Sequence, residues 1–372
     1  MSSNQPRLSI GLPVYNGEKF IKEALDSLLA QTFEDFELII SDNASTDKTE
    51  EICREYTRQD QRICYYRNDT NIGCARNFNR VFELSSGEYF KRAAYDDLHS
   101  PDFIKKCVEV LDQDPTIILC HSQAYFIDEQ GSFIQNYDIK LKADALKPQV
   151  RFHELLTKHL CYQCYGVIRA SALRMTPPMG GYGNADGILL LRLGILGRFY
   201  EIPEYLFFVR RHPQQSMSMF FPNYLLFADK SKKPLLSMLP DFYGYAVWFD
   251  SAKKGQILLP HWRIIWEYVL SIWCSPMSLN ERLCCHRSLH QQLKGTEYLL
   301  LKDLLMALQR LYEIFAGFVK GDGGDGGDEG DGGDEGDEGD GGDGGDEGDG
   351  GDEGDGGDEG DEGDGGIKKV FF

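Results

Sequence analysis

The sequence predicts an α/β fold in which a mostly parallel β-sheet is flanked by helices. Three observations lead to this prediction. Short apolar segments of strand length alternate with amphipathic segments of helix length from residue 8 to residue 120. Polar residues follow most of the apolar segments, as they do at the carboxyl edge of an open parallel sheet. Hydrophobic residues make up 42% of the 372 positions, which is sufficient for a buried core.

The first predicted strand covers residues 8–14, where Leu8, Ile10 and Leu12 alternate with small or polar residues. We expect Pro13 to end the central part of its ladder, because proline cannot donate a backbone hydrogen bond. Apolar runs of similar length predict four further strands. They cover residues 36–40, 63–66, 88–94 and 116–120.

Helices are predicted between these strands, because apolar residues recur there at intervals of three or four positions. Three of these helices follow side chains that can cap a helix. Ser45, Thr46 and Asp47 supply such side chains for the second helix, and Asn71 supplies one for the third. Ser100 precedes Pro101 at the start of the fourth helix. The four helices are predicted to end near residues 29, 58, 84 and 111.

The alternation of strands and helices becomes irregular after residue 130. A short strand is predicted at residues 166–169, a helix at residues 185–197 and a strand at residues 205–211. Residues 225–320 are mainly helical in pattern. Within them, residues 261–274 form an amphipathic segment that is too short to span a bilayer. We interpret it as a helix that packs in a core, with contact to a membrane surface as the alternative.

The formal net charge of −20 is concentrated near the end of the sequence. Residues 321–365 are fifteen Gly-Asp-(Gly or Glu) triplets that carry 22 of the 59 acidic residues. The other 37 balance the 37 lysines and arginines of residues 1–320, because the last two of the 39 basic residues are Lys368 and Lys369. A neutral body excludes a basic nucleic-acid-binding protein. The triplets contain no apolar residue, which predicts a disordered tail.

These patterns divide the chain into an α/β domain and three further segments. The predicted segments are residues 1–224, the helical region at 225–320, the acidic tail at 321–366 and a short end at 367–372. The first seven residues lack the pattern of a signal peptide, so we expect a cytoplasmic protein that could touch the inner membrane face. The ten cysteines are expected to be reduced, and Cys161 and Cys164 lack the second pair that a zinc site needs.

Polar residues that follow the predicted strands are the candidates for a binding site, because ligands of parallel sheets bind beyond the carboxyl ends of the strands. These residues are Tyr15, Asn16, Asp42, Asn43, Arg67, Asn68, Asp96 and Asp97. Two adjacent carboxylates suit Mg²⁺ or Mn²⁺, and such an ion could bridge a diphosphate. A tyrosine ring can stack on a base, and an aspartate can accept from a base or a ribose. The sequence has no glycine-rich phosphate loop, so phosphates would be held mainly through the metal.

Five segments of the sequence, spread over roughly residues 7–130, resemble family 2 glycosyltransferases. They are Ser9–Asn16, Ser27–Phe33, Glu37–Asp47, Asn71–Asn77 and Tyr95–Asp97. The resemblance implies a GT-A fold and transfer of a sugar from a nucleotide-diphosphate sugar, with inversion at the anomeric carbon. It also implies a glycan or lipid-linked acceptor, in the synthesis of a cell-surface glycan or polysaccharide.

The resemblance assigns roles to residues at the predicted sheet edge and beyond it. Asp97 would be the main ligand of the Mg²⁺ or Mn²⁺ ion, and His212 could complete the metal site. Asp96 would lie beside the donor sugar or the diphosphate. The nucleotide-sugar-binding residues implied by the resemblance are Pro13, Tyr15, Asn16, Asp42, Asn43, Arg76 and Asp96.

An inverting transfer needs one base that deprotonates the acceptor hydroxyl on the face opposite the leaving diphosphate. The resemblance implies that this base lies at the start of a helix, and Asp186 lies in the first turn of the apolar helix predicted at residues 185–197. A carboxylate at this position is also stabilised by the helix dipole without any catalytic role. Arg210 and Arg211 could bind phosphate or could simply be solvated.

Two alternatives remain at this stage. Tyr95 stands where the family more often has an acidic or small residue, and Asn43 replaces a common second acid. Both would suit a non-catalytic nucleotide-binding or scaffold protein with the same fold. A nucleotidyltransferase would need a glycine-rich basic loop near the N-terminus, and residues 13–16 are not such a loop. The sequence does not predict an oligomeric state.

Overall fold

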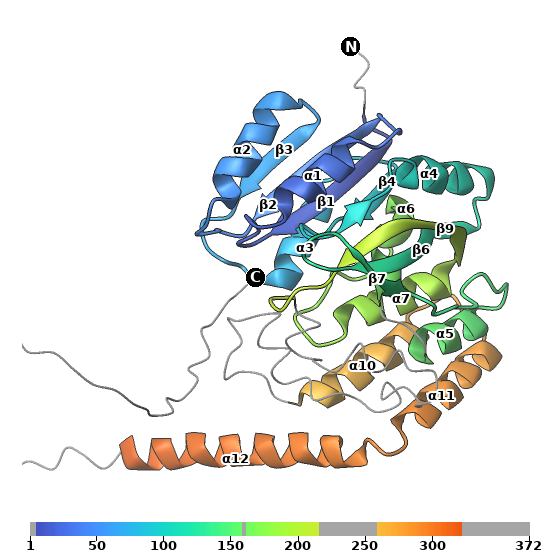
Figure 1. Cartoon of the computed structure of the whole chain (residues 1–372). Coiled ribbons are helices and arrows are strands. Elements are labelled where there is room, and N and C mark those ends of the chain that lie inside the picture. The colour runs from blue at the N-terminus through green and yellow to red at the C-terminus, as the bar shows by residue number, and fades with distance from the viewer. Residues whose placement is uncertain (1–4, 158–160, 216–258, 322–372) are drawn as a thin grey trace, which may run out of the picture. The chain divides into compact units, whose positions relative to one another are not determined.

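The computed structural model describes residues 5–157, 161–215 and 259–321 (Figure 1). The described residues up to Gln309 belong to one compact unit, and residues 310–321 belong to a second unit as the end of helix α12 (Glu297–Gly321). Residues 216–258 and the acidic tail lie outside the described residues. The predicted domain boundaries and the predicted disorder of the tail therefore stay predictions.

A mixed sheet of nine strands lies at the centre of the first unit, among the residues that the structure describes. Eight strands follow the order β3-β2-β1-β4-β8-β6-β9-β5, and β7 pairs with β6. The strands are β1 (Leu8–Val14), β2 (Phe36–Asp42), β3 (Ile63–Arg67), β4 (Tyr89–Arg92), β5 (Leu98–His99), β6 (Ile117–Ile127), β7 (Phe133–Asn136), β8 (Val167–Arg169) and β9 (Arg198–Arg210). The four strands β3, β2, β1 and β4 are parallel, whereas β5, β7 and β8 join antiparallel.

Helices cover both faces of this sheet, as the sequence predicts (Figure 1). One core cluster joins β1 and β2 to α1 (Ile21–Leu29), α2 (Thr49–Gln59) and α4 (Phe103–Gln113). A second cluster on the opposite face contains side chains of α3 (Cys74–Glu83), α6 (Ala170–Arg174) and α7 (Ala185–Leu196). The prediction of a mostly parallel sheet flanked by helices is confirmed.

Pro13 lies inside β1 and does not end the strand. Pairing with β2 continues as far as Val14, whose carbonyl accepts a hydrogen bond from Asn43 N–H at 2.8 Å. The carbonyl of Gly11 accepts instead from Ala93 N–H, on the β4 side of the strand. Backbone groups of alternate residues face the same neighbour, so the missing N–H of Pro13 also faces the β4 side. Pairing with β4 ends at Gly11, and the proline therefore costs no ladder bond there.

Helix α7 buries apolar side chains on two sides, because it lies between the sheet and a third cluster of helices. Leu189, Leu190 and Leu193 pack on the sheet, whereas Ile188 and Leu191 belong to a third cluster. That cluster includes α5 (Pro148–Thr157), α10 (Pro260–Trp273) and α11 (Leu279–Leu293). The core-packing interpretation of residues 261–274 is thus confirmed. No helix among the described residues is long and apolar enough to cross a membrane.

The predicted start of the second helix is confirmed in part. Helix α2 begins at Thr49 with Lys48 at the N-cap position, and Asp47 Oδ1 accepts from the N–H of Thr49 at 3.0 Å, whereas Ser45 does not cap the helix. The hydroxyl of Ser45 accepts instead from Asn16 N–H at 2.9 Å. One carboxylate oxygen of Asp47 accepts from Glu18 N–H at 3.0 Å. These polar side chains join two loops, which is a use that a local pattern does not distinguish from capping.

The third and fourth helices begin two residues later than predicted. Helix α3 begins at Cys74 after Gly73, whose φ of 87° favours glycine, and Asn71 lies outside it. The N-cap position of α4 is Asp102 rather than Ser100. Elements that were not predicted are β5, β7, α5 and α6, and β6 and β9 are longer than the predicted strands.

Candidate active site

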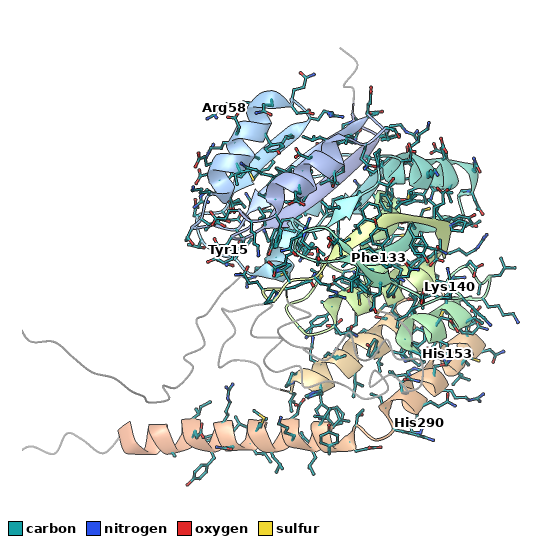
Figure 2. All side chains as sticks on the ribbon, in the orientation of Figure 1. Tyr15, Arg58, Phe133, Lys140, His153 and His290 are labelled. Atoms are coloured by element: carbon teal, nitrogen blue, oxygen red, sulfur yellow. The ribbon has the colours of Figure 1, made fainter. Side chains whose placement is uncertain are left out.

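The loops that follow β1 and β2 are hydrogen-bonded to each other. Asn16 has a φ of 52° and Ala44 a φ of 63°, so both loops turn sharply at the end of their strands. Asn16 N–H donates to Ser45 Oγ at 2.9 Å, and Thr46 N–H donates to Asn16 Oδ1 at 2.8 Å. Tyr15 is half-buried and lies at the same end of the strands (Figure 2). The sheet edge predicted from the sequence therefore exists as a tightly linked pair of loops.

Asp42 is completely buried, and both of its carboxylate oxygens accept hydrogen bonds. Oδ1 accepts from Ser45 N–H at 2.8 Å. Oδ2 accepts from the hydroxyl of Tyr65 and from Nη1 of Arg67, each at 2.7 Å. The carboxylate thus holds the loop after β2 against the end of β3. This contact network is a use of Asp42 that the sequence analysis missed.

Asn43 belongs to a buried network of amide side chains. Its Oδ1 accepts from Asn68 Nδ2 at 3.0 Å, and its Nδ2 donates to Asn71 Oδ1 at 2.8 Å. Asn68 Nδ2 also reaches Asn77 Oδ1 at 3.1 Å, and the hydroxyl of Ser41 donates to the same oxygen at 2.6 Å. The network connects β2, the loop before α3 and α3 itself. Asn71 and Asn77 lie in one of the segments that carry the family resemblance, so a signal for this network was present in the sequence.

Arg76 is exposed in the first turn of α3, directly before the buried Asn77. Pro13 is half-buried within β1. Together with Tyr15 and Asn16, these side chains lie around the loops after β1 and β2. They are the accessible members of the predicted nucleotide-sugar site, whereas Asp42 and Asn43 are enclosed.

Asp96 and His212 face each other across the ends of two segments that are far apart in the sequence. Asp96 follows β4, and His212 follows β9. Asp96 Oδ2 lies 2.9 Å from His212 Nε2. The ring of His212 also packs against Phe20, with 4.8 Å between the ring centroids, and its Nδ1 is buried without a hydrogen-bond partner among the described residues.

Asp97 faces the interior rather than His212. Its Oδ1 accepts from the backbone N–H of Arg210 at 3.0 Å, and the side chain is buried. Burial and the neighbouring Asp96 raise the pKa of Asp97 well above its usual range, although Arg211 and Lys91 act in the opposite direction. Asp97 therefore anchors the loop after β4 to β9.

Arg210 is buried rather than solvated, which corrects one of the two interpretations from the sequence. Its Nε donates to the carbonyl of Asp96 at 2.8 Å, and Nη2 pairs with Glu23 at 2.6 Å. Nη1 donates to the carbonyl of Glu129 at 2.8 Å. Arg210 thus fixes the backbone of the Asp96 loop. The side chain of Arg211 is also mostly buried and contacts the hydroxyl of Tyr162.

Asp186 lies in the first turn of α7 and is paired with Arg92 at the end of β4. Arg92 Nη1 donates to Asp186 Oδ1 at 3.0 Å, and the Asp186 side chain keeps 24% of its surface exposed. Burial raises the pKa of Asp186, and Arg92 only partly offsets this effect. The N-cap residue Asn184 adopts a φ of 59°, and its Nδ2 donates to the hydroxyl of Tyr268 at 2.7 Å. Helix α10 therefore supports the loop that presents Asp186.

Lys91 is a buried charged residue that sequence reasoning missed. It lies in β4, directly before Arg92, and has no exposed surface. Its Nζ donates to the carbonyls of Arg92 and Tyr165 at 2.9 and 3.0 Å, and it lies 5.1 Å from the centroid of the Phe103 ring. Burial lowers the pKa of Lys91 to about 7. The signal in the sequence that could have predicted this buried charge is a lysine within the strand predicted at residues 88–94.

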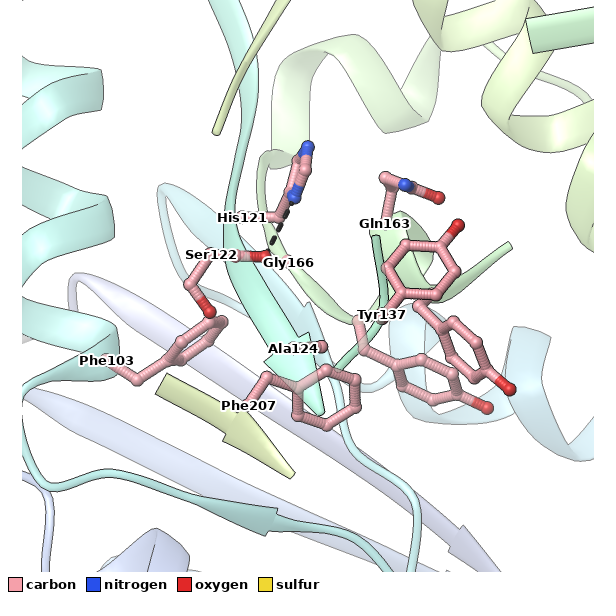
Figure 3. A pocket seen from close by; sticks show the side chains of 10 residues that line it. Phe103, His121, Ser122, Ala124, Tyr137, Gln163, Gly166 and Phe207 are labelled. Carbon is pink, nitrogen blue, oxygen red and sulfur yellow. Dashed lines mark hydrogen bonds between the residues drawn. The ribbon is translucent and has the colours of Figure 1, made fainter. Parts of the chain in front are cut away.

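A small cavity lies among side chains of β6, β9 and the 3₁₀ turn η1 (Tyr162–Tyr165), and Figure 3 shows it from close by. Its volume of about 10 Å³ suits one water molecule. His121, Gln163 and Phe207 are among the side chains that line it, and no predicted site residue does so. The cavity is too small for a sugar, so it is not the predicted site.

Among the residues that the structure describes, no group of three or more His, Cys, Asp or Glu side chains is arranged to hold a metal ion. The pair of Asp96 and His212 remains as two possible ligands. All ten cysteines are free, as the sequence predicts, and Cys164 is buried.

Comparison with known proteins gives a family match over part of the chain. Residues 9–175 match the family model described as Glycosyl transferase family 2. The uncharacterized glycosyltransferase MJ1057 of Methanocaldococcus jannaschii is 33% identical over 159 residues, which are 42% of this chain and 54% of that protein. The uncharacterized glycosyltransferase RT0329 of Rickettsia typhi is 38% identical over 118 residues, which are 31% of this chain and 36% of that protein.

The chain thus spans about half the length of these curated relatives, or less. Among solved structures, S. aureus TarS 1-349 in complex with UDP-GlcNAc is 18% identical to the chain, with a TM-score of 0.47. The alignment covers 77% of this chain and 88% of that chain.

Proposed function

From the match of residues 9–175 to the glycosyl transferase family 2 model, we propose that this protein transfers a sugar from a nucleotide-diphosphate sugar to a hydroxyl group. The proposed acceptor is a glycan or a lipid-linked saccharide, in the synthesis of a cell-surface glycan or polysaccharide. The proposed reaction inverts the anomeric carbon and depends on Mg²⁺ or Mn²⁺. A cytoplasmic location, with contact to the inner membrane face, belongs to the same proposal.

The observation that carries the proposal is the 2.9 Å separation of Asp96 Oδ2 and His212 Nε2. Neighbouring ligands of an octahedral ion with bonds of about 2.1 Å lie about 3 Å apart, so both atoms fit one Mg²⁺ or Mn²⁺ ion. Magnesium is commonly held by one or two protein ligands together with water and substrate phosphates. A set of only two ligands is therefore consistent with an ion that is completed by the donor.

The geometry favours Asp96 over Asp97 as the carboxylate that would hold the ion. Asp96 faces His212, whereas Asp97 accepts from Arg210 N–H in the interior. We therefore propose Asp96 and His212 as the ligands and Asp97 as the residue that positions Asp96. Such an ion would neutralise negative charge on the leaving diphosphate.

Asp186 is the proposed base that takes the proton of the acceptor hydroxyl. Its raised pKa makes it a better proton acceptor than an ordinary aspartate, and about a quarter of its side chain remains accessible. Arg92 holds one carboxylate oxygen through Nη1, which orients the other oxygen. The supporting contact between Asn184 and Tyr268 keeps the start of α7 in place.

The accessible side chains around the first two loops would hold the donor. Tyr15 is proposed to stack on the base, with Pro13 and Asn16 around it. Arg76 is exposed at the start of α3 and is proposed to reach the diphosphate. Asp42 and Asn43 contribute indirectly, because their side chains are buried and shape the loop after β2.

The experiment is a nucleotide-release assay with a panel of UDP- and GDP-sugars, in the presence of Mn²⁺ or after chelation. We expect nucleoside diphosphate release that requires the ion. Asp96→Asn and His212→Ala should each reduce it by about 10³-fold, because an ion holding the leaving group contributes several kcal/mol. Asp97→Asn should reduce it by less than about tenfold, since the amide oxygen can still accept from Arg210 N–H.

The opposite order of effects would restore Asp97 as the main ligand. Full activity of Asp96→Asn after chelation would contradict the metal-dependent reaction. Tight binding of a nucleotide sugar without any release, with every acceptor tested, would instead favour the non-catalytic nucleotide-binding protein.

A further inference from the structure

Helix α10 exposes three tryptophans on one side. Trp262, Trp266 and Trp273, here called the α10 tryptophan row, are 40%, 56% and 51% exposed. An α-helix turns by about 100° per residue, so these side chains lie within about 40° of one another around the helix axis. The chain has four tryptophans, so most of them lie on one side of one helix. Isolated surface hydrophobes do not account for such a row, which therefore indicates an interaction site.

The opposite side of α10 is packed inside the first compact unit. Ile264, Tyr268 and Ile272 are buried in the third core cluster. The carboxylate of the buried Glu267 pairs with Arg192 of α7 at 2.5 Å. These contacts fix the rotation of α10 about its axis, so the tryptophan row faces away from the core. Core packing thus uses only the inward side of this helix.

Tryptophan favours the boundary between lipid and water, because its ring is apolar and its Nε1–H is a hydrogen-bond donor. Nε1 of Trp262 donates to the carbonyl of Leu300 at 3.2 Å. Nε1 of Trp266 and Nε1 of Trp273 meet no acceptor among the residues that the structure describes. A dry protein interface would have to place an acceptor opposite each of these two groups. Lipid head groups offer carbonyl and phosphate oxygens at every position, which favours a membrane surface as the occupant.

Basic side chains border the row. The side chain of Arg263 is 58% exposed beside it. The guanidinium of Arg282 lies 5.2 Å from the centroid of the Trp273 ring, and its Nη1 donates to the Trp273 carbonyl at 2.6 Å. Residues 259–296 contain four basic and two acidic residues, and one of the acids, Glu267, is buried. The exposed charge of α10 and α11 is therefore positive, which complements anionic lipid head groups.

The net charge of the whole chain is −20, so this attraction must be local. At physiological salt, charges act over a Debye length of about 8 Å, which is about the scale of the row and its border. A second copy of the chain is a less suitable occupant. In a symmetric dimer the row would meet itself, and the basic border of one copy would face that of the other.

We infer that the α10 tryptophan row docks on the surface of a membrane that contains anionic lipids. The inference rests on the proposed function, because it names the surface that would bring the enzyme to a lipid-linked acceptor. The inward side of α10 supports the loop of Asp186 through the 2.7 Å bond between Asn184 and the hydroxyl of Tyr268. Helix α10 would therefore hold the proposed base close to acceptors that the membrane carries.

The test is co-sedimentation of the full chain, at physiological salt, with vesicles made of equal parts of phosphatidylcholine and phosphatidylglycerol. We expect binding, together with a shift of the tryptophan emission to shorter wavelength as the rings leave water. Trp266→Gln/Trp273→Gln should weaken binding by more than about tenfold, because two rings no longer enter the interface. This variant should keep the circular dichroism of the native protein, since both side chains are exposed.

The matched control is Phe133→Gln/Tyr205→Gln. These two aromatic side chains are 61% and 40% exposed on β7 and β9, outside the row, so this variant should bind vesicles as the native protein does. Absence of binding, equal binding by Trp266→Gln/Trp273→Gln and the native protein, or equal weakening by the control would overturn the inference. So would a native dimer in light scattering that Trp266→Gln/Trp273→Gln dissociates, because the occupant would then be a second copy.

Nucleotide release measured without vesicles separates this inference from the proposed function. Trp266→Gln/Trp273→Gln should release nucleotide at the native rate, because the row faces away from the core and carries no proposed site residue. Nucleotide release by a protein that binds no vesicles would contradict this inference alone. Vesicle binding through the row by a protein that releases no nucleotide would contradict the proposed function alone.

Discussion

The polar side chains after β1 and β2 differ from those around the end of β4 in how completely the protein satisfies them. Both oxygens of Asp42 and both polar atoms of Asn43 have hydrogen-bond partners, and both side chains are buried. Around β4, by contrast, Arg92 Nε and His212 Nδ1 are buried without partners among the described residues. In the first region, folding supplies hydrogen-bond partners for the polar atoms of both side chains. The second region retains buried polar atoms without such partners among the described residues.

Several titratable groups around the end of β4 also have shifted pKa values. Burial raises the pKa of Asp97 and of Asp186 and lowers that of Lys91 to about 7. Groups that fold into unfavourable electrostatic environments concentrate at functional sites, because a ligand or a reaction later uses them. The comparison therefore separates a scaffold, which holds the donor loops, from the region where the chemistry is proposed.

Asp186→Asn should have the largest effect among the variants that test whether the two regions differ in role. The amide oxygen can still accept from Arg92 Nη1, so the loop before α7 should keep its structure. The substitution removes the proposed base, and kcat should fall by about 10²- to 10⁴-fold while KM for the donor stays within about twofold. Steady-state kinetics of nucleotide release with an acceptor would measure both constants.

The native enzyme provides the pH control for this prediction. Asp186 acts as a base only when it is deprotonated, and its pKa is raised. The acid limb of kcat should therefore lie at a higher pH than for an ordinary aspartate, and activity should rise as the pH increases through it. An unchanged kcat in Asp186→Asn, or a change in KM alone, would move Asp186 from the chemistry to the scaffold.

The sequence predicted the first half of the sheet well, because its strands and helices repeat with clear periods. It could not predict how Asp42 is used, since the donors Tyr65 and Arg67 lie 23 and 25 residues further along the chain. The contact between Asp96 and His212 joins residues 116 positions apart, and only the family resemblance brought the two into one predicted site. Local patterns identify which polar residues end strands, but the partners that satisfy them depend on the tertiary fold.

The next largest effect should come from Asp42→Asn, which tests whether the first region is a scaffold. An amide has only one accepting oxygen, whereas Asp42 accepts on both oxygens. In either orientation its NH₂ group would face a donor, either Ser45 N–H or the pair of Tyr65 and Arg67. We expect the free energy of unfolding to fall by about 3 kcal/mol, measured by urea denaturation without ligand.

The matched control for Asp42 is Asp60→Asn. Asp60 pairs with Arg62 at 2.7 Å, but both side chains are partly exposed, at 21% and 27%. Its substitution should cost less than about 1 kcal/mol. Equal effects at the two positions, or an Asp42→Asn protein of native stability that fails to bind the donor, would make Asp42 a direct donor contact instead.

The smallest expected effect concerns Lys91. It tests whether burying this lysine lowers the free energy of unfolding in the β4 region. The pKa of Lys91 is about 7 in the folded protein and 10.5 without burial, so between these values the unfolded chain binds more protons. Stability contributed at this position must therefore rise with pH across that window. Relative to Lys91→Met, the native protein should gain about 2 kcal/mol in the free energy of unfolding between pH 7.5 and 9, since one pKa unit corresponds to about 1.4 kcal/mol.

Lys105→Met, at an exposed lysine of α4, should show no such change with pH. A pH-independent difference for Lys91→Met would mean that Lys91 keeps its proton through contacts with the carbonyls of Arg92 and Tyr165, and the β4 region would then be as well satisfied as the loops after β1 and β2.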